Sequence, residues 1–279
     1  MTDGVVGKRV KVGAWLIAEK RDKAFDGERE TDNPLQEATS IRVPLVTLDV
    51  RVTQQFGIQA AATVPSITRT AVVTAAGAPL NFRESFKGMG DTSVLAWYRL
   101  APINRWNVVF NFGASLPTGR SERPRFREEL QGGNLVPMSR LQRGSGTVDP
   151  VFGVNVDRSI RTTTLFGSVA ARTPVAESKF GLQTGTSSEL SVGIARSLGS
   201  RRVTGFGRLG WLHRRQDTFE GTPILVGGGN WLYVTPGLAL QVGKGVNAQM
   251  EMKVPVYRSL ANRQLDSVVI FQFGLSRSF

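Results

Sequence analysis

The chain has 279 residues, which fits either two ordinary domains or one large all-β domain. It contains no cysteine, which excludes disulfides, zinc–thiolate sites and cysteine nucleophiles. The net charge of +13 is typical of nucleic-acid-binding proteins, but the basic residues are spread along the whole chain. We therefore expect no nucleic-acid partner. Five basic residues fall in expected short turns: Arg105, Arg158, Arg161, Arg201 and Arg202.

Alternation of apolar and polar residues with a period of two dominates the sequence and predicts β-strands. No run of 18 apolar residues occurs, so no transmembrane helix is expected. The mean hydropathy of -0.11 still permits a membrane protein, because a transmembrane barrel needs apolar residues only at every second strand position. Twelve strands are predicted, at 9–20, 45–54, 58–65, 91–100, 106–116, 147–157, 163–172, 188–196, 203–214, 231–241, 246–257 and 267–279.

The connections between these strands alternate between long and short. Segment 21–40 is too charged to be core, segment 66–87 is expected to be a loop rich in glycine, alanine and serine, and segment 117–146 is the longest break. Long loops alternating with short turns and an even strand number are typical of outer-membrane barrels. We therefore predict a single all-β domain over 1–279, an up-and-down transmembrane β-barrel of about 12 strands with both termini in the periplasm.

The segment 117–146 is expected to be an extracellular loop or a plug folded inward. Its arginines suit lipopolysaccharide phosphates, because guanidinium groups bind phosphate bidentately. A solvated basic loop with internal ion pairs to Glu122, Glu128 and Glu129 is the alternative. The arginines are Arg120, Arg123, Arg125, Arg127, Arg140 and Arg143.

If the apolar side chains face lipid, the alternate side chains line the interior. The interior of twelve strands is narrow, which leaves two interpretations open. In one, the charges pair internally and give little selectivity. In the other, aromatic side chains stack a small flat solute while Arg51, Arg99 and Arg208 favour an anionic group such as a carboxylate. The residues expected to line the lumen are Trp15, Asp49, Arg51, Trp97, Arg99, Asn111, Asn155, Phe206, Arg208, Trp231, Tyr233, Glu251 and Lys253.

The last strand, from Ser267 to Phe279, has a full apolar face and ends on an aromatic residue. It resembles the C-terminal strand of Gram-negative outer-membrane β-barrels, apart from Arg277, where that pattern has an apolar residue. The resemblance implies that Phe279 belongs to the signal recognised by the barrel assembly machinery. The first twenty residues do not fit a signal peptide, because Lys8, Arg9 and Lys11 interrupt their apolar run. We interpret the sequence as a mature or truncated form of an exported protein.

Several short motifs flank the predicted strands: Gly88-Met89-Gly90-Asp91, Leu116-Pro117-Thr118-Gly119, Gly144-Ser145-Gly146-Thr147-Val148-Asp149-Pro150, Thr235-Pro236-Gly237-Leu238 and Val254-Pro255-Val256-Tyr257. With these motifs, residues 45–279 resemble the outer-membrane transporter family named for the meta-pathway of phenol degradation. The resemblance implies a Gram-negative outer-membrane barrel that passes small organic molecules, aromatic ones among them, in contact with outer-membrane lipid and lipopolysaccharide.

No enzymatic chemistry, metal or cofactor is expected. His213 is the only histidine, which argues against a His-rich metal site. It shares strand parity with Leu209 and Trp211, so a phospholipase-like barrel is one alternative, but no Gly-x-Ser-x-Gly elbow accompanies it. We interpret His213 as an interfacial residue beside an interfacial Trp. Aromatic girdles are expected at Tyr98, Trp106 and Trp211. A soluble or periplasmic β-rich binding module is the remaining alternative.

Overall fold

The computed structural model describes residues 9–75, 78–120, 128–131, 134–137, 143–199, 202–224 and 227–279. Among these residues no helix is long and apolar enough to span a membrane. The strands of the main sheet are β1 (Val10–Asp26), β2 (Arg29–Thr31), β3 (Ala38–Arg51), β4 (Phe56–Thr63), β5 (Ser66–Ala75), β6 (Ala78–Lys87), β7 (Thr92–Arg99), β8 (Asn107–Leu116), β11 (Asp149–Ile160), β12 (Thr163–Arg172), β14 (Ser187–Ser197), β15 (Val203–Arg214), β18 (Gly229–Gly243), β19 (Val246–Leu260) and β20 (Gln264–Ser278).

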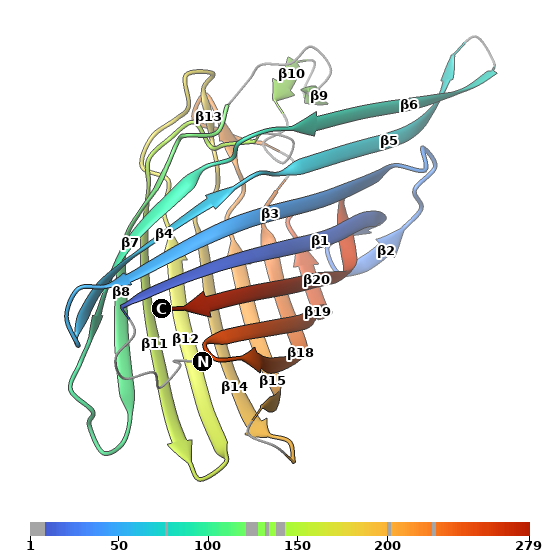
Figure 1. Ribbon diagram of the computed structural model, residues 1–279. Helices are drawn as coiled ribbons and strands as arrows, with labels where there is room; N and C mark the ends of the chain where they lie inside the picture. Colours follow the sequence, from blue (N-terminus) through green and yellow to red (C-terminus); the bar gives the residue numbers. More distant parts are fainter. Residues whose placement is uncertain are drawn as a thin grey trace.

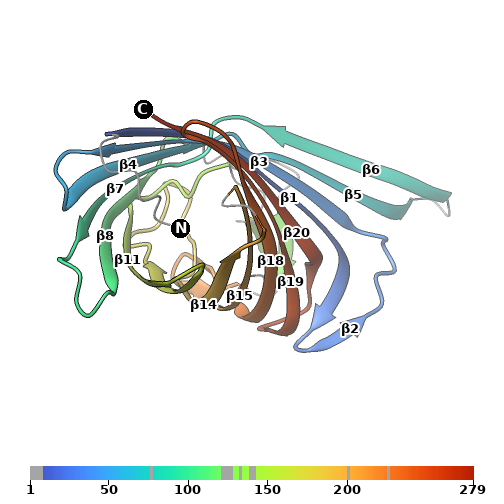
Figure 2. The same cartoon turned by 60° about the horizontal axis from the view of Figure 1, so that its bottom comes forward.

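The sheet closes on itself because β1 pairs with two strands at once. Along its length β1 is antiparallel to β20 on one side and to β3 on the other, and Trp15 lies opposite both Gly274 and Leu45. The closed wall runs β1-β3-β4-β7-β8-β11-β12-β14-β15-β18-β19-β20. Figures 1 and 2 show this barrel from the side and obliquely from one end. The predicted fold, an all-β antiparallel barrel of twelve strands, is therefore confirmed.

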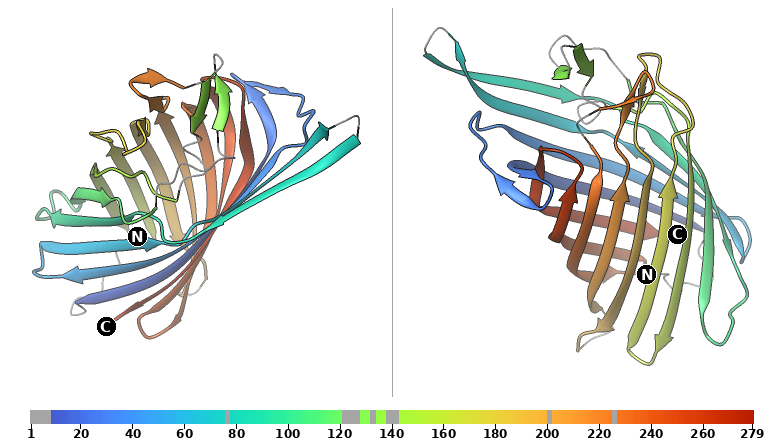
Figure 3. Two further views of the ribbon diagram at one scale, coloured as in Figure 1. Left: turned by 90° about the horizontal axis from the view of Figure 1, so that it is seen from above. Right: turned by 180° about the vertical axis from the view of Figure 1, so that it is seen from behind.

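Two expectations about connections were wrong. Residues 66–87 are not a loop, because β5 continues the line of β4 along β3 and β6 pairs back along β5. This hairpin projects beyond the barrel wall (Figures 1 and 3). Its β-branched residues, such as Ile67, Thr68 and Thr70, favour strand structure and outweigh the small residues around them. The charged segment 21–40 also contributes strand, because β1 runs to Asp26 and β3 begins at Ala38.

The two ends of the barrel differ in their connections. Arg9, the first described residue, Phe279 and the shorter turns, such as 52–55 and 161–162, lie at one end, which we call the turn end. The opposite end, the loop end, carries the β5–β6 hairpin and the longer connections, although the β19–β20 connection is only residues 261–263. Short strands β13 (Leu182–Gln183), β16 (Thr218–Phe219) and β17 (Thr222–Pro223) tie two of these loops together.

The exterior of the barrel is apolar and the interior is polar. Val46 is 57% exposed, Phe152 60% and Leu275 54%, and their strand neighbours of opposite parity point inward. Tyr98 and Trp211 are also exposed on the exterior, near strand ends. A wall that exposes apolar side chains outward and polar ones inward reverses the pattern of a soluble protein.

Three glycine-containing motifs of the sequence converge at the loop end. The Asp91 carboxylate accepts hydrogen bonds from the backbone N–H groups of Gly119 (3.2 Å) and Ser145 (2.7 Å), and the Thr118 hydroxyl donates to the carbonyl of Gly90 (2.9 Å). Close approach needs glycine here, because a Cβ atom at Gly119 would lie 2.8 Å from the Cα of Gly144. The three motifs therefore fasten both ends of the long connection between β8 and β11.

Within that connection the structure describes only the hairpin of β9 (Glu128–Gln131) and β10 (Asn134–Pro137), besides residues 117–120 and 143–148. The Nη1 of Arg143 donates to the carbonyl of Lys87 at 3.2 Å. Of the predicted lipopolysaccharide-binding arginines, Arg123, Arg125, Arg127 and Arg140 lie outside the described residues. Lipopolysaccharide binding by this loop stays a prediction.

Candidate functional site

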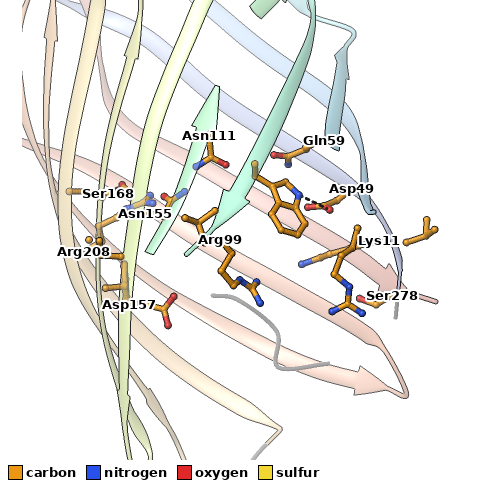
Figure 4. Close-up of a pocket in the computed structure, with 18 of the residues that line it drawn as sticks. Lys11, Asp49, Gln59, Arg99, Asn111, Asn155, Asp157, Ser168, Arg208 and Ser278 are labelled. Carbon is orange, nitrogen blue, oxygen red and sulfur yellow. Dashed lines mark hydrogen bonds between the residues drawn. The ribbon is translucent and has the colours of Figure 1, made fainter. Parts of the chain in front are cut away.

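The candidate site is a cavity of about 440 Å³ inside the barrel (Figure 4). Seven of the residues expected to line the lumen lie on its wall: Asp49, Arg51, Trp97, Arg99, Asn111, Asn155 and Arg208. Adjacent strands bring several of them together in one interstrand row, because Arg51 lies opposite Gly57, Gly57 opposite Trp97 and Trp97 opposite Asn111.

One side of the cavity is cationic. Lys11 of β1 lies directly opposite Asp49 of β3, and the Trp97 indole donates to the Oδ1 of Asp49 at 3.2 Å. Among the described residues, Arg51 and Arg99 form no ion pair. The guanidinium carbon of Arg99 lies 5.8 Å from the centre of the Trp97 ring, and its Nε is buried without a hydrogen-bond partner in the described part of the chain. Two guanidinium groups are therefore left to meet an anion.

The other side of the cavity is neutral and polar. Asn111 and Asn155 contribute amides, and the hydroxyls of Ser168 and Ser191 lie 2.7 Å apart. Amides and hydroxyls both donate and accept hydrogen bonds. A solute held by this side needs no charge of its own.

Interior aromatic rings lie flat on glycines of the neighbouring strand. Four such pairs stand directly opposite each other across adjacent strands: Trp15 and Gly274, Trp97 and Gly57, Phe166 and Gly193, and Phe206 and Gly237. A Cβ atom at any of these glycines would overlap the ring that covers it. The glycines let the rings lie along the wall, as in aromatic rescue of glycine in sheets, and the lumen stays open.

Arg208 differs from the other predicted arginines because its charge is balanced. Its Nη2 donates to the Oε1 of Glu251 at 3.1 Å, and the Glu251 side chain is only 6% exposed. The expectation that Arg208 offers a free positive charge to a solute was wrong. In this part of the wall, charged interior residues pair with each other, which is the alternative interpretation given above for the lumen.

Trp231 and Tyr233 do not reach the cavity. They pack with Phe25 and Leu260 in a buried cluster of the interior, and the Trp231 indole donates to Asp266 at 2.9 Å. Lys253 lies 4.2 Å over the Tyr233 ring and 3.4 Å from Glu189. These side chains pack against one another in the interior, so their aromatic rings are not available to stack on a solute.

Sequence reasoning missed several residues that line the cavity, among them Lys11, Gln59, Asp157, Phe166, Ser168 and Ser191. All have the inward parity of predicted strands, so the alternation already contained them. What the sequence did not show is which rows of neighbouring strands are in register, and this decides which inward residues meet.

His213 lies on the exterior, with a ring nitrogen, Nδ1, 2.8 Å from the Oδ1 of Asn230 and its ring stacked on Trp211. Ser188 of β14 lies directly opposite it, a neighbour that sequence spacing did not reveal. Among the described residues no hydrogen bond joins Ser188 to His213. Within the same residues, no group of three His, Cys, Asp or Glu side chains is placed to hold a metal ion.

Comparison with solved structures places this architecture in a known class. The chain is similar to an outer membrane channel from Pseudomonas putida F1, with a TM-score of 0.74 and 10% identity over 100% of this chain and 99% of that one. The transport unit of the autotransporter AIDA-I from Escherichia coli gives 0.52, at 12% identity over 100% and 93%. The β-domain of the Bordetella autotransporter BrkA gives 0.50, at 14% identity over 97% and 100%.

The fold is thus that of outer-membrane β-barrels. At such low identities the similarity establishes the fold alone. No protein-family model and no curated protein matches the sequence.

Proposed function

We propose that this protein is an outer-membrane channel for passive passage of small organic solutes, and that it favours flat solutes carrying a carboxylate. The observation that carries the proposal is a pair of arginines, Arg51 and Arg99, that form no ion pair among the described residues and lie beside the flat ring of Trp97 in an interior cavity. The motif resemblance to transporters of the phenol meta-pathway and the fold shared with a Pseudomonas outer membrane channel both support it.

The membrane location is supported by the exterior of the barrel. Leu48, Phe112 and Val192 are among many large apolar side chains that the wall exposes. Burying apolar surface is favourable by about 25 cal/mol per Å², so a belt of this kind stabilises a barrel in lipid and promotes aggregation in water. A soluble binding module is disfavoured for the same reason.

The cavity can select a solute by combining three contacts. A carboxylate meets the guanidinium groups of Arg51 and Arg99, which bind it through charge-assisted hydrogen bonds. A flat ring lies against Trp97, and hydroxyl substituents meet Asn111 or Asn155. Each contact is modest and partly wet, so the solute binds weakly enough to leave again, as passage requires.

Assembly is proposed to depend on the last strand. Phe279 is exposed on the exterior, and the guanidinium of Arg277 stacks on its ring at 4.8 Å. Arg277 therefore covers the aromatic residue without removing it from the surface, and we propose that Phe279 remains available to the barrel assembly machinery.

Uptake into proteoliposomes tests the proposed function. We expect benzoate to enter faster than phenol, and both faster than gluconate, which carries a charge but no ring. Equal entry of all three solutes would refute the preference for aromatic solutes. Entry of phenol alone would indicate that the substrate is neutral and not anionic. Folding is checked separately by the shift in gel mobility on boiling, which a closed barrel shows.

A further inference from the structure

The exterior of β11, β12 and β14 carries an unusual arrangement at the turn end. The outward residues of these strands stand in register in three rows: Ile160, Thr163 and Arg196, then Arg158, Leu165 and Ile194, then Val156, Gly167 and Val192. Two arginines, Arg158 and Arg196, therefore flank the central strand β12 from either side. Most of the exterior side chains of these strands are apolar, so a pair of arginines among them calls for an explanation.

No described carboxylate neutralises either of these arginines. Among the described residues Arg158 and Arg196 form no ion pair. The Nε of Arg158 is buried and has no hydrogen-bond partner there, while its guanidinium lies 5.7 Å from the centre of the Trp106 ring. The nearest carboxylate along β11, Asp157, has inward parity and accepts a hydrogen bond from Asn107 at 3.0 Å.

More positive charge stands close by. Arg105 in the β7–β8 turn and Arg161 in the β11–β12 turn are both exposed, and both have positive φ, 67° and 55°. The hydroxyl-bearing Thr163 lies directly opposite Arg196. The edge of the barrel here is a cationic rim directly beside the apolar wall.

Next to this rim, the outward face of β12 lacks a side chain at one position. Gly167 has no side chain, whereas its cross-strand neighbours are Val156 and Val192. A Cβ atom at Gly167 would lie 3.3 Å from the carbonyl oxygen of Ser191, 3.5 Å from the Val156 side chain and 3.8 Å from the Val192 side chain, so the wall is flatter at the glycine than a side chain would leave it.

We propose that this surface binds a phospholipid with an anionic head group, its phosphate between Arg158 and Arg196 and one acyl chain over Gly167. The inference rests on the proposed function, because it needs the exterior to face a bilayer. Arginine binds phosphate oxygens bidentately, and basic residues beside a membrane attract anionic lipids. The turn end is the periplasmic end in the outer-membrane arrangement, so the lipid belongs to the phospholipid leaflet.

Native mass spectrometry of the detergent-solubilised barrel tests the inference. The protein is offered equal amounts of phosphatidylglycerol and phosphatidylcholine with the same acyl chains. We expect the wild type to retain phosphatidylglycerol at least about tenfold more than phosphatidylcholine, as two basic residues near a lipid surface imply. Arg158→Gln with Arg196→Gln should remove the preference, and Gly167→Val should lower retention of both lipids.

The matched control is Arg42→Gln with Arg215→Gln, which removes the same charge from two exposed arginines toward the loop end. It should retain the wild-type preference. Equal loss in the control would overturn the inference, because net charge alone would then explain binding. If glycerol 3-phosphate displaced bound phosphatidylglycerol as well as phosphatidylglycerol itself does, the inference would also be overturned, since the site would then recognise a free phosphate and not a lipid. If boiling does not shift the gel mobility of the protein, no closed barrel has formed. That result would refute the proposed function and not the lipid inference alone.

Discussion

The indole nitrogen of Trp97 donates a hydrogen bond of 3.2 Å to the Oδ1 of Asp49, two strands away. The bond spans Gly57, whose missing side chain lets the ring lie flat against the wall. This arrangement keeps the lumen open beside Arg51 and Arg99, and the width of the channel depends on it.

Gly57→Val should therefore narrow the channel. The valine would force the Trp97 ring off the wall into the cavity, and overpacking of this kind costs about 1–3 kcal/mol. Single-channel conductance in planar bilayers should fall clearly, and urea unfolding should show the lost stability. Gly207→Val is the control, because nothing lies within 4 Å of a Cβ atom at Gly207. Equal conductance of the two variants would refute a role of Gly57 in channel width.

Glu251→Gln should raise anion selectivity while lowering stability. It leaves the Arg208 guanidinium without its partner, and because Arg208 is 27% exposed we expect a loss of about 1–3 kcal/mol, below the cost of breaking a fully buried pair. Arg208→Gln combined with Glu251→Gln should recover most of this loss, as a double-mutant cycle in urea would measure. A double variant as unstable as the sum of the single variants would show that the pair is not coupled.

Asp91→Ala should loosen the loop end. The substitution removes two backbone hydrogen bonds to a charged acceptor that is 11% exposed, and we expect a loss of about 2–4 kcal/mol. Limited proteolysis should then cut the connection between β8 and β11 sooner. Asp22→Ala is the control, since its pair with Lys20 is exposed and such pairs contribute about 0–1 kcal/mol. Unchanged cleavage in Asp91→Ala would contradict the fastening role.

The sequence predicted the barrel because its strands follow one rule throughout. A wall with lipid on one side and water on the other imposes a period of two. Every strand of the closed wall was found, although β1 runs on to Asp26 and β3 begins at Ala38, each beyond the predicted bounds. The hairpin of β5 and β6 was missed because it lies outside the wall. Leu80, Phe82 and Phe86 do alternate there as in a strand, but small residues such as Ala71 and Gly77 gave the segment the composition of a loop.

The candidate site was predicted only in part, because the sequence does not show how neighbouring strands align. Parity along a strand tells which side a residue faces, but meeting another residue depends on how neighbouring strands align. Arg208 and Glu251 both had inward parity, yet only the structure brings them 3.1 Å apart. Trp231 likewise faces inward, but its neighbours Phe25 and Leu260 bury it.

The reversal potential in a potassium chloride gradient, measured across a planar bilayer, tests the central claim most directly. The wild-type channel should be anion-selective, and Arg51→Gln combined with Arg99→Gln should bring the reversal potential close to zero, because these two arginines line the cavity and form no ion pair among the described residues. Arg42→Gln with Arg215→Gln should leave it unchanged. A cation-selective wild type, or an anion selectivity that survives the loss of both Arg51 and Arg99, would contradict the account.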